Sequence, residues 1–138
     1  MRNFFLLFLM LTLFSCEKNE TYDILPDVPV NITINLNLPQ FNKLKTPPNW
    51  EYINGGINGI LIQSTGQTPA YKAYDRACPN NDCTSSMVYD GSLRMKCPCD
   101  NSEYSILEGS PQTTGNSYFA REYRVTQINA TTIIITNN

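Results

Sequence analysis

Hydrophobic and polar residues alternate with a period of two along several short stretches of this chain. The clearest example is residues 30–38, where five hydrophobic side chains are separated by polar ones throughout. This alternation predicts a strand with one buried face. Similar but shorter patterns predict further strands at 50–53, 57–63, 70–75, 87–89, 93–96, 104–106, 123–128 and 131–135.

Residues that favour turns separate these expected strands. Pro39, Pro47-Pro48 and Gly55-Gly56 interrupt the first half of the chain, and Asp90-Gly91 is a strong hairpin signal. No window has a convincing helical period of 3.6. Short strands with turn signals every 8–12 residues or so indicate one all-β domain, an antiparallel sandwich or small barrel.

The N-terminal segment has the pattern of a secretory signal. Arg2 precedes an uninterrupted run of mainly apolar residues, 4–14, and Ser15-Cys16 follows. The run is shorter than the roughly 20 apolar residues that a spanning helix needs. Leu13-Phe14-Ser15-Cys16 resembles a bacterial lipobox, which implies cleavage before Cys16 and lipidation of that residue. An ordinary signal peptide with a nearby cysteine is the alternative.

These features predict three segments: a lipoprotein signal at 1–15, a lipidated flexible tether at 16–29 and a β domain at 30–138. Without the signal, nine basic side chains face twelve acidic ones, a net charge of −3. This charge argues against a nucleic-acid partner. We expect a bacterial cell-envelope protein attached to the membrane through its lipid anchor, with an envelope protein as partner.

Four cysteines remain after processing: Cys78, Cys83, Cys97 and Cys99. An even number in an exported β domain favours two disulfides, in one of three connectivities. A structural zinc site with four cysteine ligands is an alternative. The intervals of four residues and one residue fit a zinc site poorly, because zinc ribbons usually repeat a Cys-x₂-Cys spacing.

The cysteine segments, 78–83 and 97–104, resemble the two cluster-binding loops of Rieske iron–sulfur domains. That family has Cys-x-His-x-x-Cys in the first loop and Cys-Pro-Cys-His-Gly-Ser-x-Tyr in the second. The chain reads Cys-Pro-Asn-Asn-Asp-Cys and Cys-Pro-Cys-Asp-Asn-Ser-Glu-Tyr. The resemblance extends over about residues 57–136. It implies a Rieske-like fold with both cysteine loops at one end.

Carried over by position, the resemblance implies that Cys78 and Cys97 would bind iron and that Cys83–Cys99 would be a disulfide joining the loops. Ser102 and Tyr104 would donate hydrogen bonds around a [2Fe–2S] cluster. Gly109, Pro111 and Gly115 match a third family element, whereas Asn116 and Ser117 depart from it.

The departures affect the iron ligands most. Asn80 and Asp100 occupy the two histidine positions, and the chain contains no histidine. Two imidazoles define the Rieske cluster, so we expect the orthodox cluster to be lost and Cys78 to pair with Cys97. The alternative is an electron-transfer protein whose [2Fe–2S] cluster has the atypical ligands Cys78, Cys97 and Asp100.

The sequence does not support an enzyme that works alone. Without histidine there is no Ser-His or Cys-His pair. The acidic residues near the cysteines have no spacing typical of a two-carboxylate site. We therefore expect a binding or structural role without a cofactor, or at most electron transfer.

Overall fold

The computed structural model describes residues 23–138, so the expected signal and Cys16 lie outside the described residues. No helix within the described range is long and apolar enough to cross a membrane. Short strands dominate this range, with one 3-10 helix between the first two. In chain order the elements are β1 (Asn31–Asn35), η1 (Asn42–Lys45), β2 (Trp50–Ile53), β3 (Ile60–Ser64), β4 (Tyr71–Asp75), β5 (Val88–Tyr89), β6 (Arg94–Lys96), β7 (Glu103–Ser105), β8 (Glu122–Asn129) and β9 (Thr132–Thr136).

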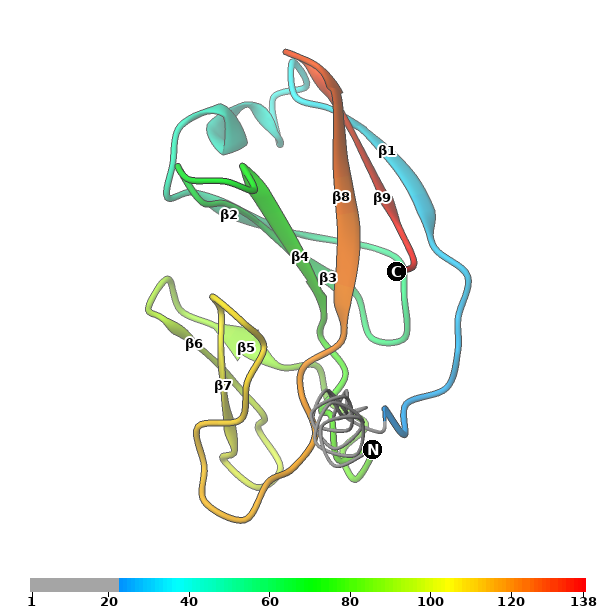
Figure 1. The fold of residues 1–138 in the computed structure, drawn as a ribbon, viewed down its shortest axis with the longest axis vertical. Coiled ribbons are helices and arrows are strands. Elements are labelled where there is room, and N and C mark those ends of the chain that lie inside the picture. Colours follow the sequence, from blue (N-terminus) through cyan, green and yellow to red (C-terminus); the bar gives the residue numbers. More distant parts are fainter. Residues whose placement is uncertain (1–22) are drawn as a thin grey trace, which may run out of the picture.

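The strands form a large curled sheet and a small sheet at one end of the molecule (Figure 1). The large sheet has the order β1-β9-β8-β4-β3-β2, and the small one has the order β5-β6-β7. Every strand pair is antiparallel. Strands β5 and β6 flank Asp90-Gly91 and form the hairpin that this dipeptide predicts. The all-β architecture expected from the sequence is confirmed.

Strands β3 and β4 are buried on both faces and separate two hydrophobic cores. Ile60 and Ile62 of β3 point into the first core, whereas Leu61 between them points into the second. In β4, Ala73 and Tyr74 divide between the cores in the same way. The alternation of side chains along a strand produces this division.

The first core lies within the curve of the large sheet, and the second lies between the two sheets. The first core contains Val30, Ile34, Leu36, Leu44, Ile60, Ile62, Ala73, Tyr123, Ile133 and Ile135. The second contains Leu61, Tyr74, Cys78, Met87, Tyr89, Met95, Cys97, Tyr104, Ile106 and Ala120. Cys78 and Cys97 are thus part of the packing that attaches the small sheet to the large one.

Two predicted strands differ from their expected bounds by more than one residue. The first ends at Asn35, and the next residues form turns and η1, although Leu36 is fully buried. Strand β3 begins at Ile60 and not at 57, because residues 55–59 form a turn with three glycines at positive φ. A β-carbon at Gly56 would collide with the Asp75 carboxylate and the Tyr123 hydroxyl, so this turn requires a glycine.

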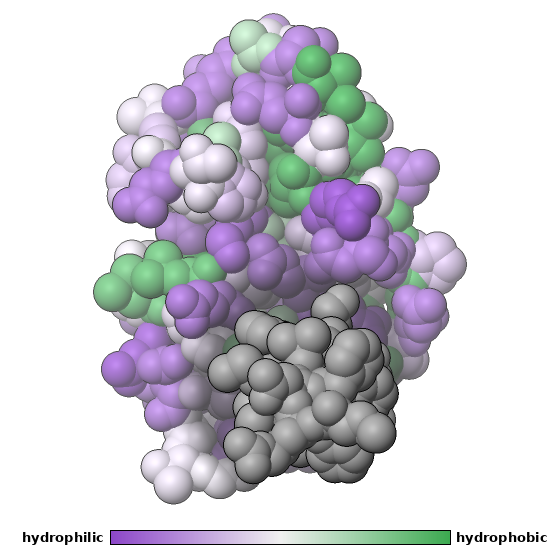
Figure 2. All heavy atoms as spheres, in the orientation of Figure 1, coloured by the Kyte–Doolittle hydropathy of each residue, from purple (hydrophilic) through white to green (hydrophobic). Residues whose placement is uncertain are grey.

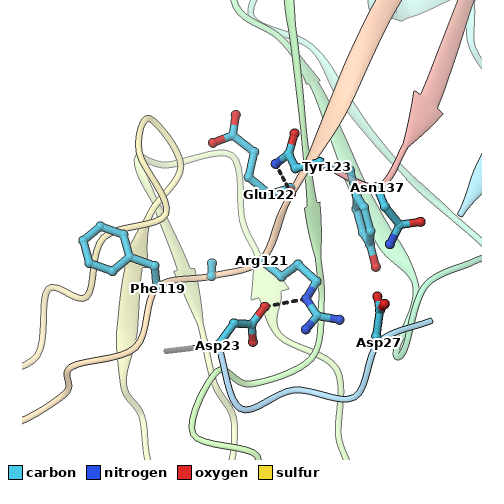
Figure 3. A pocket seen from close by; sticks show the side chains of 9 residues that line it. Asp23, Asp27, Phe119, Arg121, Glu122, Tyr123 and Asn137 are labelled. Atoms are coloured by element: carbon cyan, nitrogen blue, oxygen red, sulfur yellow. Dashed lines mark hydrogen bonds and ion pairs between the residues drawn. The ribbon is translucent and has the colours of Figure 1, made fainter. Parts of the chain in front are cut away.

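Residues 23–29, expected as part of a flexible tether, pack against the domain. The Arg121 guanidinium forms an ion pair with Asp23 at 2.6 Å (Figure 3). It also donates hydrogen bonds to the carbonyl oxygens of Leu25 and Pro26. Leu25 is only 6% exposed. This segment, which we call the strap, borders a hollow of about 370 Å³ together with residues 119–123 and 137–138.

The face seen in Figure 2 is largely hydrophilic. Hydrophobic side chains gather there over the part of the large sheet that contains β8, β9 and β1. Ile128, at the end of β8, is 55% exposed. The cysteine loops lie at the other end of the long axis, beside the small sheet.

Candidate functional site

The first cysteine loop starts from a buried carboxylate at the end of β4. Asp75 is 0% exposed and accepts hydrogen bonds from the backbone N–H groups of Ile57 (2.7 Å) and Ala77 (2.7 Å). The Tyr123 hydroxyl donates a further hydrogen bond to it at 2.7 Å. A buried carboxylate with these donors is satisfied, and Asp75 thereby fixes the backbone just before Cys78.

The loop then turns sharply through residues 78–81. The backbone N–H of Asn81 donates to the carbonyl oxygen of Cys78 at 2.9 Å. Asn81 has a φ of 54°, a left-handed conformation that asparagine adopts more readily than most residues. Met87 N–H donates to Arg76 carbonyl oxygen at 2.6 Å and closes the base of the loop.

The second loop joins β6 to β7 and turns in a similar way. The N–H of Asn101 donates to the carbonyl oxygen of Cys97 at 3.0 Å, and the N–H of Cys97 donates to the carbonyl oxygen of Ser102 at 2.8 Å. Asn101 has a φ of 61°. It stands where the Rieske motif has glycine, and its left-handed conformation explains how asparagine replaces that residue.

Two disulfides join the loops: Cys78–Cys97, with Cα atoms 5.7 Å apart, and Cys83–Cys99, with Cα atoms 5.8 Å apart. The resemblance implied the Cys83–Cys99 bond, and the loss of the histidine ligands led us to expect the Cys78–Cys97 bond. The first disulfide is buried, with Cys78 1% and Cys97 0% exposed. Cys83 is half-buried and Cys99 is exposed, so the second disulfide lies at the surface.

The two disulfides are close neighbours. The Sγ atoms of Cys78, Cys83 and Cys97 all lie within 4.8 Å of one another. Cys99 is not part of this group. The Cys83 sulfur atom of the exposed disulfide therefore lies close to both sulfur atoms of the buried disulfide.

The two residues at the histidine positions are held by hydrogen bonds at the loop tips. The Asn80 side-chain amide donates to Asn116 Oδ1 at 3.1 Å. The Asp100 carboxylate accepts hydrogen bonds from the Ser102 hydroxyl at 2.6 Å and from the Ser102 backbone N–H at 2.9 Å. These bonds, with a smaller contribution from the Asn80 side chain, hold the pKa of Asp100 below its usual value.

Tyr104 lies behind this layer. Its hydroxyl is 3.4 Å from the Ser102 hydroxyl and accepts a hydrogen bond from the Asn116 amide at 3.4 Å. Burial raises the pKa of the Tyr104 hydroxyl, so the ring is neutral at physiological pH. Ser102 and Tyr104 thus support the side chains of Asp100 and Asn116.

Segment 109–116 covers one side of the loops. Pro111 pairs with Tyr104 as an isolated bridge, and the Gln112 N–H donates to the Glu103 carbonyl oxygen at 2.7 Å. A β-carbon at Gly109 would approach the Ala120 carbonyl oxygen to 2.9 Å, which explains the glycine. Asn116, at the end of this segment, reaches both Asn80 and Tyr104.

The residues present do not fit an orthodox Rieske cluster. Such a cluster needs two thiolates and two imidazoles, whereas Cys78 is bonded to Cys97 and the imidazole positions hold an amide and a carboxylate. A zinc site with four cysteine ligands would need thiolates, and in this arrangement all four sulfur atoms belong to disulfides.

Comparison with solved structures supports the architecture. The domain is similar to the ferredoxin of carbazole 1,9a-dioxygenase from Nocardioides aromaticivorans IC177, with a TM-score of 0.50 and 16% identity, covering 81% of this chain and 100% of that one. At this identity the likeness concerns the fold. The chain therefore has a Rieske ferredoxin-like fold. No protein-family model matches the chain, and no curated protein does.

Three residues that organise this end of the molecule are not among the site residues expected from the sequence. Asp75 was indistinguishable from the exposed acidic residues around it, since burial of one carboxylate leaves no pattern in a sequence. Asn116 could have been singled out from the sequence, because this residue departs from the third Rieske element. Arg121, which holds the strap, could not, because its partners are almost a hundred residues away.

Proposed function

We propose that this protein is a lipid-anchored component of the bacterial cell envelope with a binding or structural role. In this proposal its Rieske-like loops hold two disulfides in place of an orthodox [2Fe–2S] cluster. One observation carries the proposal: the four positions that would bind the cluster are all engaged with protein atoms. Cys78 and Cys97 bond each other, Asn80 contacts Asn116, and Asp100 contacts Ser102.

The chemistry of the substituted side chains supports loss of the cluster. A neutral amide oxygen, as in Asn80, is a poor iron ligand in this setting. A carboxylate at Asp100 would add negative charge, and cluster charge is one of the factors that set the potential. The disulfides take over the joining of the two loops, and closing loops of this size contributes about 3 kcal/mol each in the chain-entropy model.

The strap supports a close attachment to the membrane. Cys16 lies seven positions before Asp23, which pairs with Arg121. Seven residues span at most about 25 Å when fully extended. The described chain begins near the end that carries the small sheet and the cysteine loops (Figure 1). A lipid on Cys16 would keep this end near the membrane surface.

Replacing the expected lipid site tests the anchor. Cys16→Ala should release the protein from membranes or leave its signal uncleaved, whereas Ser15→Ala, which keeps a small residue before the cysteine, should behave as wild type. Membrane fractionation and intact mass measure both outcomes. A Cys16→Ala protein that fractionates and migrates as wild type does would contradict the anchor.

Restoring the imidazoles tests the loss of the cluster. Asn80→His combined with Asp100→His should let the loops recruit iron and sulfide when Cys78 and Cys97 are kept reduced during assembly. The wild type and each single variant should not, because they lack at least one imidazole. Stoichiometric iron and sulfide in the wild type, at the level of the double variant, would contradict the proposal.

A second function, electron transfer, is favoured by two observations. The similar solved structure is a ferredoxin, and three cysteine sulfur atoms lie within 4.8 Å of one another. In this alternative Cys78, Cys97 and Asp100 would hold a [2Fe–2S] cluster, with Ser102 and Tyr104 beside it. Binding a cluster in this way requires the Cys78–Cys97 disulfide to be reduced. Measuring the iron content together with the number of free thiols therefore distinguishes electron transfer from the binding or structural role.

A further inference from the structure

We propose that the two disulfides form an exchange relay, in which an external dithiol reduces the exposed Cys83–Cys99 bond and Cys83 passes the reduction to the buried Cys78–Cys97 bond. This goes beyond a binding or structural role, and it rests on the proposed function only in requiring an exported protein with both disulfides formed. The partner class is a dithiol protein or small dithiol of the envelope.

Two features of the loops carry the proposal. The Cys83–Cys99 bond is accessible, since Cys99 is exposed, whereas both sulfur atoms of Cys78–Cys97 belong to residues that are at most 1% exposed. The Cys83 Sγ atom lies within 4.8 Å of both buried sulfur atoms. A reductant therefore reaches the outer bond first, and the inner bond is within reach of the sulfur atom that this reaction releases.

The chemistry balances as thiol–disulfide exchange. A thiolate of the external dithiol attacks Cys99 Sγ, forms a mixed disulfide with it and releases the Cys83 thiolate. Cys83 then attacks the Sγ of Cys78 or Cys97, forming a new bond and releasing the other as a thiolate. The second thiol of the partner resolves the mixed disulfide and frees Cys99. The partner leaves oxidised by two electrons, and its two protons remain on the two new thiols.

The consequence for the domain is a change at the loop tips. Oxidised protein has both bridges between the loops. After exchange one bridge remains, from Cys83 to Cys78 or Cys97, and one buried cysteine becomes a free thiol in the second core. The packing between the small and large sheets includes both buried cysteines, so the reaction couples the redox state of a partner to this interface.

A pair of matched variants tests the relay in the full chain. Cys99→Ala leaves Cys83 as a thiol beside the buried disulfide, whereas Cys83→Ala leaves Cys99, which lies outside the group of close sulfur atoms. Each protein is isolated oxidised, acid-quenched, unfolded and alkylated. Cleavage before Asp82 separates Cys78 from Cys83, and cleavage after Lys96 separates both from Cys97.

The relay predicts that in Cys99→Ala the alkylated thiol is found at Cys78 or Cys97 as well as at Cys83. In Cys83→Ala the label should stay on Cys99. Label confined to Cys83 in the first variant, or equal migration in both variants, would overturn the proposal.

Wild-type protein gives a test that depends on no substitution. Less than one equivalent of a dithiol is added before the acid quench, and the remaining bridges are mapped. The relay predicts a Cys83–Cys78 or Cys83–Cys97 bridge with a free thiol at Cys99. Singly reduced protein that keeps only Cys78–Cys97 would overturn it. If the native protein contains four free thiols before any dithiol is added, the result instead contradicts the proposed function, in which the loops hold two disulfides.

Discussion

The Tyr123 hydroxyl donates a 2.7 Å hydrogen bond to the buried carboxylate of Asp75. This bond joins the start of β8 to the end of β4, three residues before Cys78. The same carboxylate accepts N–H groups from the glycine turn and from Ala77. The base of the first cysteine loop therefore depends on the buried Asp75 side chain and its hydrogen-bond donors.

We predict that Tyr123→Phe destabilises the domain by about 1–3 kcal/mol, because it removes a hydrogen-bond donor from a buried carboxyl group. Urea unfolding followed by tyrosine fluorescence or circular dichroism measures this change. Tyr71→Phe is the control, since Tyr71 is half-buried and no hydrogen bond of its hydroxyl is found among the described residues. Equal stability of Tyr123→Phe and wild type would show that Asp75 does not need this donor.

Alkaline pH should destabilise the domain through its buried tyrosines. Burial raises the pKa values of Tyr74 and Tyr123, and the hydrogen bond to Asp75 raises that of Tyr123 further. Tyrosines of the unfolded chain ionise near pH 10, whereas these two keep their protons when folded. Their stabilising contribution is thus complete below about pH 10 and is lost as the pH rises above it.

The urea midpoint of unfolding, measured at about pH 8 and about pH 11, tests whether stability decreases at alkaline pH. The two pH values lie on either side of the ordinary tyrosine pKa. We expect a lower midpoint at the higher pH and a smaller decrease in Tyr123→Phe. A midpoint that does not change between the two values would contradict the role assigned to tyrosine burial.

The strap should loosen when Arg121 is replaced. Arg121→Ala removes the ion pair with Asp23 and two hydrogen bonds to backbone carbonyl oxygens. We expect the amides of Leu25 and Val30 to exchange with solvent at least about tenfold faster, corresponding to ~1.4 kcal/mol of local opening. Arg124→Ala, at an exposed position in β8 three residues further along the chain, should leave their exchange unchanged. Equal exchange rates of these amides in the two variants would contradict the role of Arg121 in holding the strap.

Strand pattern and turn residues predicted most of the fold because each buried strand face leaves a period of two in the sequence. The alternation of residues 30–38 gave β1, and Asp90-Gly91 gave the β5–β6 hairpin. Strand ends were less predictable. Ile57 extends the apolar pattern of β3, but the glycines beside it adopt positive φ and turn the chain there.

The candidate site was predictable where a motif specifies it. The resemblance to the Rieske loops implied the Cys83–Cys99 disulfide, and the missing histidines implied the Cys78–Cys97 pair. The structure contains both. The partner of Asn80 was not predictable, because Asn116 reaches the first loop from 36 positions away. Long-range contacts of single polar side chains leave no periodic signal in one sequence.

The disulfides should carry a measurable part of the stability. We predict that Cys83→Ala combined with Cys99→Ala lowers the free energy of unfolding by about 3 kcal/mol, the value expected for a loop of this length.

Wild-type protein alkylated under denaturing, non-reducing conditions should contain no free thiol among the four loop cysteines. Alkylation of Cys78 and Cys97 in native protein would contradict the buried bridge but not the exposed one.

The central claim is that the Rieske-like loops of this protein do not hold a functional iron–sulfur cluster. Its most direct test is the iron and acid-labile sulfide content and the visible spectrum of protein purified from the envelope without oxygen. The account predicts colourless protein with iron and sulfide at background level and both disulfides intact. Brown protein with stoichiometric iron and sulfide would contradict it and would make Asp100 the first ligand to test.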